Sequence, residues 1–282
     1  MGNVVPKPDQ ERWNARKRIH RLSGGRPLAF IETQGDGPAL MLLHGYTDSS
    51  RSYSMIEPSL QGLRLLIPDL PGHGRSAAGA GLDVESVAGD LAELLDARQI
   101  GAVILVGHSM GAMVAIALAA RLGPRATALV TISASVAPGS LLDDPLAASI
   151  LALADPIDPA EPFFDLWHAC SQPVDALFLS HARQEAAAIP AAVWHRILKN
   201  FGVTDLRDTA ARISVPVLCI AGGEDMLFDA GHRAAVEAAM PMATARLLAG
   251  QGHNPHWEDA AGTARLIRDF IGSLVPVPSR SG

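Results

Sequence analysis

The sequence predicts an α/β fold: a mostly parallel central sheet flanked by helices, with a helical segment inserted into it. Short, nearly continuous apolar runs alternate with stretches of helical periodicity, a pattern typical of strands that helices cover on both faces. The alternation stops in one long stretch, residues 135–213, and then resumes. The chain has 282 residues, of which 48% are hydrophobic and 18% charged, so it can bury a large core.

The expected strands are apolar runs bounded by turn-forming residues. The last of these runs is less uniformly apolar than the others, but it follows the same alternation. The predicted strands are residues 28–33, 39–44, 63–68, 102–107, 126–133, 215–222 and 243–250.

Three segments outside the long stretch have the periodicity of helices. Residues 83–98 place apolar side chains on one helical face, and Asp83 is expected to cap the helix. Residues 110–122 are apolar on nearly all sides, which predicts a buried helix that ends at Gly123. Residues 258–274 are expected to form a final amphipathic helix.

The inserted segment, residues 135–213, is too long for a loop and combines helical patches with many prolines. We interpret it as a helical lid between two parts of one core, residues 1–134 and 214–282. The segment carries six of the 13 aromatic residues of the chain: Phe163, Phe164, Trp167, Phe178, Trp194 and Phe201. Most should pack within the lid, and Trp167 and Trp194 are the candidates to line a substrate pocket.

Composition excludes several functional classes. The formal net charge of −6 and the pI of about 5.9 argue against a nucleic-acid-binding protein, which usually has a basic surface. No apolar run approaches the ~20 residues that span a bilayer, and the first residues lack the apolar core of a secretory signal. We therefore expect a cytoplasmic protein that binds neither membranes nor nucleic acids. The sequence does not indicate an oligomeric state.

The sequence Gly107-His108-Ser109-Met110-Gly111 matches the pattern G-x-S-x-G, with a predicted strand before it and a buried helix after it. In that context the serine lies on a sharp turn that exposes its hydroxyl group. Glycines are needed on both sides because a side chain there would collide with the neighbouring chain. Ser109 is therefore the candidate nucleophile.

From about residue 20 to residue 274 the chain resembles the α/β-hydrolase family, and in particular its serine hydrolases with a helical lid, such as esterases and lactonases. The segments that carry the resemblance are LLHGYTDSS (42–50), IPDLPGHGRS (67–76), VGHSMGA (106–112), IAGGEDMLF (220–228) and GQGHNPHWED (250–259). The resemblance implies a catalytic triad in the chain order serine, acid, histidine.

The resemblance places the catalytic base at His253, in the sequence GQGH after a late strand. Other histidines fit this role less well. His108 adjoins the nucleophile, but neighbouring side chains on a tight turn point apart, and His44 and His73 match structural loop positions of the family. His256 is the remaining alternative.

The acid that orients the base is expected at Asp225, in the sequence GGED after the predicted strand 215–222. The adjacent Glu224 is the first alternative. Some members of the family carry the acid after the preceding strand, but here no carboxylate follows that strand before Asp143.

Two backbone N–H groups are expected to form the oxyanion hole, those of Met110 and Tyr46. Met110 follows the nucleophile, and Tyr46 follows the pair His44-Gly45. No phosphate-binding, dinucleotide-binding or metal-binding motif is present, so we expect neither a metal nor another cofactor.

The sequence thus predicts a hydrolase that cleaves a small, partly apolar carboxylic ester or lactone through an acyl-Ser109 intermediate. One alternative is a carbon–carbon bond hydrolase of aromatic ring-cleavage products, although those relatives usually carry Asn where this chain has His108. Another is a receptor that keeps the triad and turns its ligand over very slowly. Epoxide hydrolases and haloalkane dehalogenases need Asp in place of Ser109.

Overall fold

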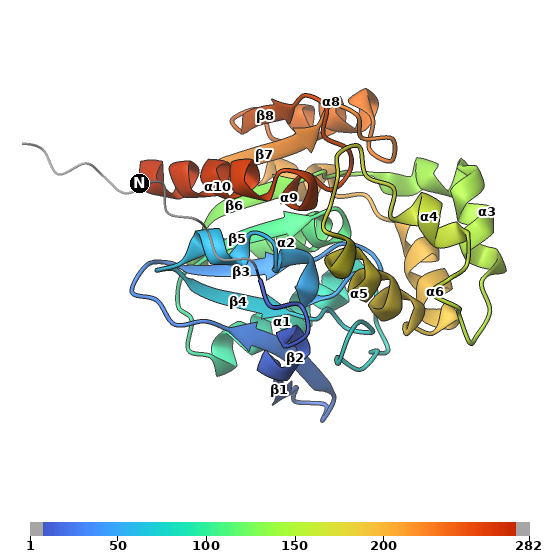
Figure 1. Cartoon of the computed structure of the whole chain (residues 1–282). Helices are drawn as coiled ribbons and strands as arrows, with labels where there is room; N and C mark the ends of the chain where they lie inside the picture. The colour runs from blue at the N-terminus through green and yellow to red at the C-terminus, as the bar shows by residue number, and fades with distance from the viewer. Residues whose placement is uncertain (1–7, 275–282) are drawn as a thin grey trace, which may run out of the picture.

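The computed structural model describes residues 8–274, and within them the strands form one eight-stranded sheet in the order β1-β2-β4-β3-β5-β6-β7-β8 (Figure 1). The first two strands join the sheet antiparallel, and all pairings from β4 to β8 are parallel. The mostly parallel α/β fold is therefore confirmed. The strands are β1 (Arg18–Arg21), β2 (Pro27–Glu32), β3 (Ala39–Leu43), β4 (Arg64–Pro68), β5 (Val103–His108), β6 (Ala126–Ile132), β7 (Val217–Gly222) and β8 (Thr244–Leu248).

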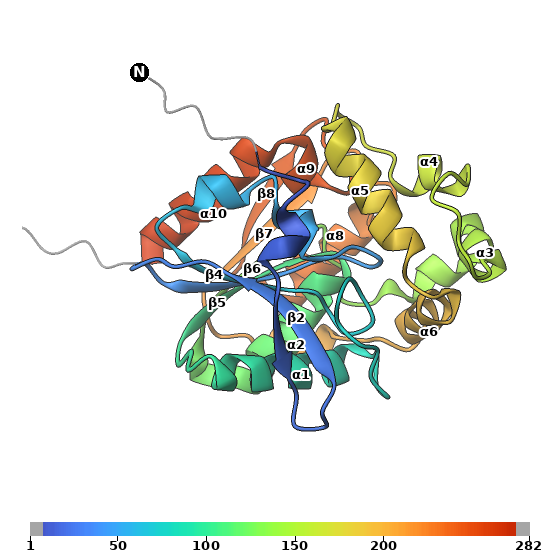
Figure 2. The same cartoon turned by 60° about the horizontal axis from the view of Figure 1, so that its bottom comes forward.

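Helices cover both faces of the sheet, as the continuous apolar strands require. Side chains alternate along each strand, so Met41 and Leu43 of β3 enter one buried cluster while Leu40 and Leu42 enter the other. Figure 2 shows α1 and α2 on one side of the sheet and α10 on the other. The helices are α1 (Val84–Ala97), α2 (Met110–Leu122), α3 (Pro145–Ala152), α4 (Phe163–Trp167), α5 (Ala176–Ala187), α6 (Ala191–Phe201), α7 (Arg207–Ala211), α8 (Ala230–Ala239), α9 (Pro255–Glu258) and α10 (Ala260–Leu274).

The helices next to the site form as the sequence predicts. The carboxylate of Asp83 accepts a hydrogen bond from the Ser86 N–H at 2.9 Å and so caps α1. Helix α2 begins at Met110 and is buried along most of its length, and Gly123 ends it with a positive φ of 55°. This rigid, buried helix fixes the direction of the chain directly after Ser109.

Two elements differ from the expectation. Strand β1 was not predicted because its residues are mostly exposed and carry no apolar alternation; backbone pairing with β2 alone forms it. The predicted helix 258–274 corresponds to α10, which begins two residues later, at Ala260, and the short helix α9 before it was not predicted. The chain leaves helical geometry at Asp259, whose carboxylate instead accepts a hydrogen bond from the Gly262 N–H in the first turn of α10.

The inserted segment contains α3 to α7, and α3 to α6 lie together at one end of the sheet (Figure 1). Its rings do not form a core of their own. Phe164, Trp194 and Phe201 join the same buried cluster as Tyr46 and Met110 of the sheet domain. The proposed boundaries at 134/135 and 213/214 stay a prediction, and residues 1–7 and 275–282 lie outside the described part. Between residues 8 and 274, no helix combines the length and the apolar character needed to cross a bilayer.

Candidate active site

Ser109 follows β5 on a strained turn, with φ of 53° and ψ of −118°. A non-glycine residue adopts this region rarely, so the surrounding chain must hold it there. The flanking glycines permit the turn. A Cβ atom on Gly107 would overlap the backbone of Gly111, and one on Gly111 would overlap the carbonyl group of Leu43. The crowding expected from the sequence is present.

The structure brings Ser109, His253 and Asp225 into one hydrogen-bonded row. The Ser109 Oγ lies 3.0 Å from the His253 Nε2, and the His253 Nδ1 lies 2.9 and 3.0 Å from the two carboxylate oxygens of Asp225. The carboxylate can only accept from Nδ1–H. That bond leaves Nε2 free to accept the serine proton.

Asp225 is 5% exposed and is held by the turn that follows β7. Its Oδ1 accepts hydrogen bonds from the N–H groups of Leu227 and Phe228 at 3.0 and 2.9 Å. Burial alone would raise the pKa of Asp225, but the His253 ring and the two backbone N–H groups outweigh it and lower the pKa. The side chain is therefore a carboxylate at neutral pH.

The alternative site residues lie elsewhere. Glu224 and Asp143 are exposed to solvent. His256 is fully buried, and its Nε2 lies 2.9 Å from the Ser52 Oγ. Burial and, after it, the nearby rings of other histidines lower the pKa of His256 well below its usual value. A neutral, buried ring bound to Ser52 is a structural histidine.

The two predicted oxyanion-hole residues flank the nucleophile in different ways: Tyr46 lines the same cavity as Ser109, and Met110 follows Ser109 in the chain. Met110 is the first residue of α2, so its N–H has no acceptor within the helix. In residues 8–274, neither N–H group has another hydrogen-bond acceptor. Both are therefore available to an oxyanion. The Tyr46 side chain is fixed separately, because its hydroxyl donates to the Trp194 carbonyl at 2.5 Å.

Two further buried groups lie near His253: His108, which the sequence suggested only as an alternative base, and Asp48, which it did not single out. The His108 Nε2 donates to the His253 carbonyl oxygen at 2.9 Å, and the His108 Nδ1 lies 3.8 Å from the Asp48 Oδ2. Burial lowers the pKa of His108 to about 3 and raises that of Asp48 to about 7. The position of His108 next to Ser109 was a usable signal, whereas nothing in the sequence around Asp48 indicates its burial.

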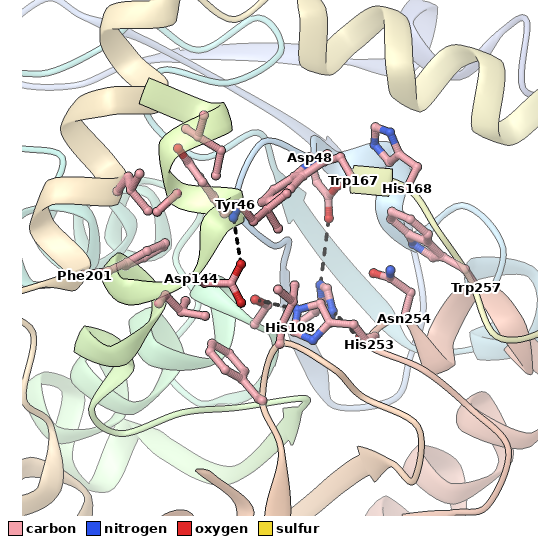
Figure 3. A pocket seen from close by; sticks show the side chains of 18 residues that line it. Tyr46, Asp48, His108, Asp144, Trp167, His168, Phe201, His253, Asn254 and Trp257 are labelled. Carbon is pink, nitrogen blue, oxygen red and sulfur yellow. Dashed lines mark hydrogen bonds and ion pairs between the residues drawn. The ribbon is translucent and has the colours of Figure 1, made fainter. Parts of the chain in front are cut away.

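A cavity opens above Ser109, between the sheet domain and the inserted segment (Figure 3). Trp167 lines it and donates from Nε1 to the Thr47 Oγ1 at 2.8 Å. Trp194 does not line it. That ring is fully buried against the rings of Tyr46 and Trp167, at centroid distances of 5.4 and 5.5 Å. The apolar lining comes from Leu141, Leu146, Ala147, Ile150, Leu198, Phe201, Leu227 and Phe228.

The arrangement can support nucleophilic attack by a serine on a carbonyl carbon. It holds a hydroxyl beside an imidazole base, an acid behind the base, and, at Tyr46 and Met110, two N–H groups without an acceptor among residues 8–274. Among residues 8–274, no group of three or more His, Cys, Asp or Glu side chains is arranged to hold a metal ion.

A family model described as "alpha/beta hydrolase fold" matches residues 38–260. The chain belongs to this family. The matched segment spans the whole row from Ser109 to His253, so the resemblance inferred from the sequence is confirmed. The inserted segment lies inside the match as well.

Individual relatives of this α/β hydrolase include ester-cleaving proteins. It is 29% identical over 256 residues to a pimeloyl-[acyl-carrier protein] methyl ester esterase of Methylococcus capsulatus. The alignment covers 86% of this chain and 98% of that protein. It is 37% identical over 126 residues to lipase LipV of Mycobacterium tuberculosis, covering only 44% of this chain and 48% of the lipase. The enol-lactonase of Burkholderia xenovorans has the same fold, with a TM-score of 0.73 at 21% identity, covering 90% of this chain and all of the other (100%).

Proposed function

We propose that this α/β hydrolase cleaves a carboxylic ester or lactone through an acyl-Ser109 intermediate. The observation that carries the proposal is the unbroken row of hydrogen bonds from Ser109 through His253 to Asp225 at the floor of a largely apolar cavity. The similarity to an ester-cleaving relative over most of both chains supports the choice of bond.

In the proposed reaction, His253 takes the proton of Ser109 as the serine oxygen attacks the carbonyl carbon. The N–H groups of Tyr46 and Met110 bind the resulting oxyanion, each contributing on the order of 3 kcal/mol. His253 then gives the proton to the departing alcohol, and the acyl-enzyme remains. A water molecule, deprotonated by His253, attacks the acyl group and releases the acid, with Asp225 stabilising the imidazolium in both halves.

The substrate we propose is a small molecule with an apolar part. The aliphatic and aromatic lining favours such a group, and the inserted segment, residues 135–213, would act as a lid that keeps bulk water from the intermediate. No metal or other cofactor enters this mechanism.

A substitution tests the proposal. Ser109→Ala should abolish hydrolysis of an activated nitrophenyl ester, because no other hydroxyl adjoins the His253 Nε2 in the described residues. Ser149→Ala, on the exposed side of α3, is the control and should retain full activity. Full activity of Ser109→Ala would refute the acyl-serine route. Wild-type turnover slower than once an hour would instead favour the receptor alternative.

A further inference from the structure

One end of the cavity carries polar side chains, and the ring nitrogens of one of them, His168, have no hydrogen-bond partner among residues 8–274. Figure 3 shows His168, Asn254 and Trp257 on the side of His253 opposite to Phe201. His168 comes from the end of α4 in the inserted segment, and Asn254 follows His253 in the chain. This end therefore differs in chemistry from the aliphatic end.

His168 is 4% exposed, lines the cavity, and has no hydrogen-bond partner at either ring nitrogen in the described residues. Two aromatic rings pack beside it. The ring stacks on Phe164 at 5.7 Å with an interplanar angle of 16°, and on Trp257 at 6.3 Å with an angle of 29°. Both ring nitrogens therefore lack a partner in the described residues, and the cavity is the space that the ring borders. A buried polar edge without a partner costs free energy, which a ligand in the cavity can recover.

Charge is disfavoured at this end. Burial, and then the positive charge of Arg183, lowers the pKa of His168 to about 3, so the ring is neutral and offers one donor and one acceptor. Burial also raises the pKa of the nearby cavity residue Asp48 to about 7. Asn254 is 6% exposed, and its amide side chain forms no hydrogen bond within residues 8–274. A neutral group that both donates and accepts fits these partners best.

We propose that His168, together with Asn254, binds an uncharged hydrogen-bonding group of the substrate, such as a carboxamide or a hydroxyl. His168 is then a specificity-determining residue. The inference rests on the proposed function, because it assigns the part of the ester substrate that lies beyond the reacting carbonyl. It makes the substrate asymmetric, with an apolar group at the Phe201 end and a neutral polar group at the His168 end.

The test uses matched ester substrates that differ only at one chain end. The three end groups are isopropyl, carboxamide and carboxylate, which have nearly the same shape. Each is placed first on the acyl side and then on the alcohol side of the ester, at several neighbouring chain lengths. For the wild type we expect kcat/KM for the carboxamide to exceed that for the isopropyl ester by about tenfold on one side. The carboxylate should be the poorest of the three. No carboxamide preference on either side, or a preference for the carboxylate, would overturn the proposal.

Variants then assign the preference to the ring nitrogens. His168→Phe keeps the stacking on Phe164 and Trp257 but removes both nitrogens, and should bring the carboxamide-to-isopropyl ratio close to one; His168→Leu serves if that variant does not fold. His168→Gln keeps a donor and an acceptor and should retain most of the ratio. The control, Phe178→Leu, loosens the packing of Trp257 from outside the cavity and should leave the ratio unchanged.

Two failures remain distinguishable. If His168→Phe keeps the full carboxamide preference, the inference is wrong while ester hydrolysis stands. If the wild type hydrolyses no ester, acetate included, the proposed function fails. Calorimetry with the free amide and its isopropyl analogue then tests the inference separately. The wild type should bind the amide about tenfold more tightly than the isopropyl analogue, and His168→Phe should bind the two equally.

Discussion

At the scale of single residues, Asp225 is buried whereas the adjacent Glu224 is exposed. Substituting each in turn therefore tests which of the two is the catalytic acid. Asp225→Asn keeps the size of the side chain but favours the wrong tautomer of His253, so kcat should fall by about 10⁴-fold. Glu224 is exposed, so Glu224→Gln should lower kcat by less than about tenfold. Steady-state kinetics on one activated ester ranks the two variants.

The control for this pair is Asp143→Asn, an exposed change that should leave activity nearly full. If Glu224→Gln proves the damaging substitution, the acid has been assigned one residue too late. A damaging Asp143→Asn would place the acid after β6.

The buried carboxyl group of Asp48 gives the protein a specific dependence of stability on pH. Its pKa is about 7 in the folded protein and about 4 in an unfolded chain. Between these values the folded state binds more protons than the unfolded state. The free energy of unfolding therefore falls as the pH rises through this window, and the stabilisation present at low pH is lost.

We predict that wild-type protein loses on the order of 2 kcal/mol more stability than Asp48→Asn between pH 5 and pH 8. The amide does not titrate, and it can still accept the hydrogen bond from the Ser52 Oγ. Urea unfolding at the two pH values measures the difference. Parallel pH curves for the two proteins would mean that Asp48 is ionised in the folded state throughout this range.

At the scale of secondary-structure elements, two tryptophans of the inserted segment should behave differently. Trp167 of α4 lines the cavity, so Trp167→Ala should lower kcat/KM more for bulky apolar esters than for acetate esters. Trp194 of α6 is fully buried outside the cavity, so Trp194→Ala should lower the free energy of unfolding by about 3–5 kcal/mol. Kinetics on esters of two sizes, with urea unfolding of both variants, separates the roles. Size-independent kinetics for Trp167→Ala would mean that the ring only packs the segment.

The elements that the sequence predicts well are those whose burial is written into a local pattern. Helix α2 starts and ends at the predicted residues because it is apolar all round, and β3 differs by a single residue at its end. Strand β1 could not be predicted, since its stability comes from backbone bonds to β2 rather than from its side chains. The break at Asp259 depends on a capping contact that periodicity does not reveal.

At the scale of the whole molecule, parallel strands bring distant segments to one edge of the sheet. Ser109 follows β5, Asp225 follows β7 and His253 follows β8, and their side chains meet although up to 144 residues separate them in the chain. Carboxyl ends of neighbouring parallel strands share an edge, so the motif order was enough to predict this meeting.

The surroundings of the site were less predictable. His168 and Asp48 owe their burial to the way the inserted segment packs on the sheet domain, a long-range contact that leaves no local pattern. For the same reason the sequence predicts both Trp194 and Trp167 as pocket residues, and only the packing shows that Trp167 lines the cavity while Trp194 does not. Motifs therefore predict the reacting groups, whereas the folded chain decides which other side chains reach the substrate.

The most direct measurement of the central claim is covalent labelling with a serine-directed phosphonate, followed by peptide mass spectrometry. Only a hydroxyl activated by a base attacks such a reagent, so a single adduct is expected, on Ser109. Asp225→Asn should slow the labelling, and Ser149→Ala should not change it. An adduct on another residue, or none at all on protein that hydrolyses esters, would contradict the acyl-Ser109 mechanism.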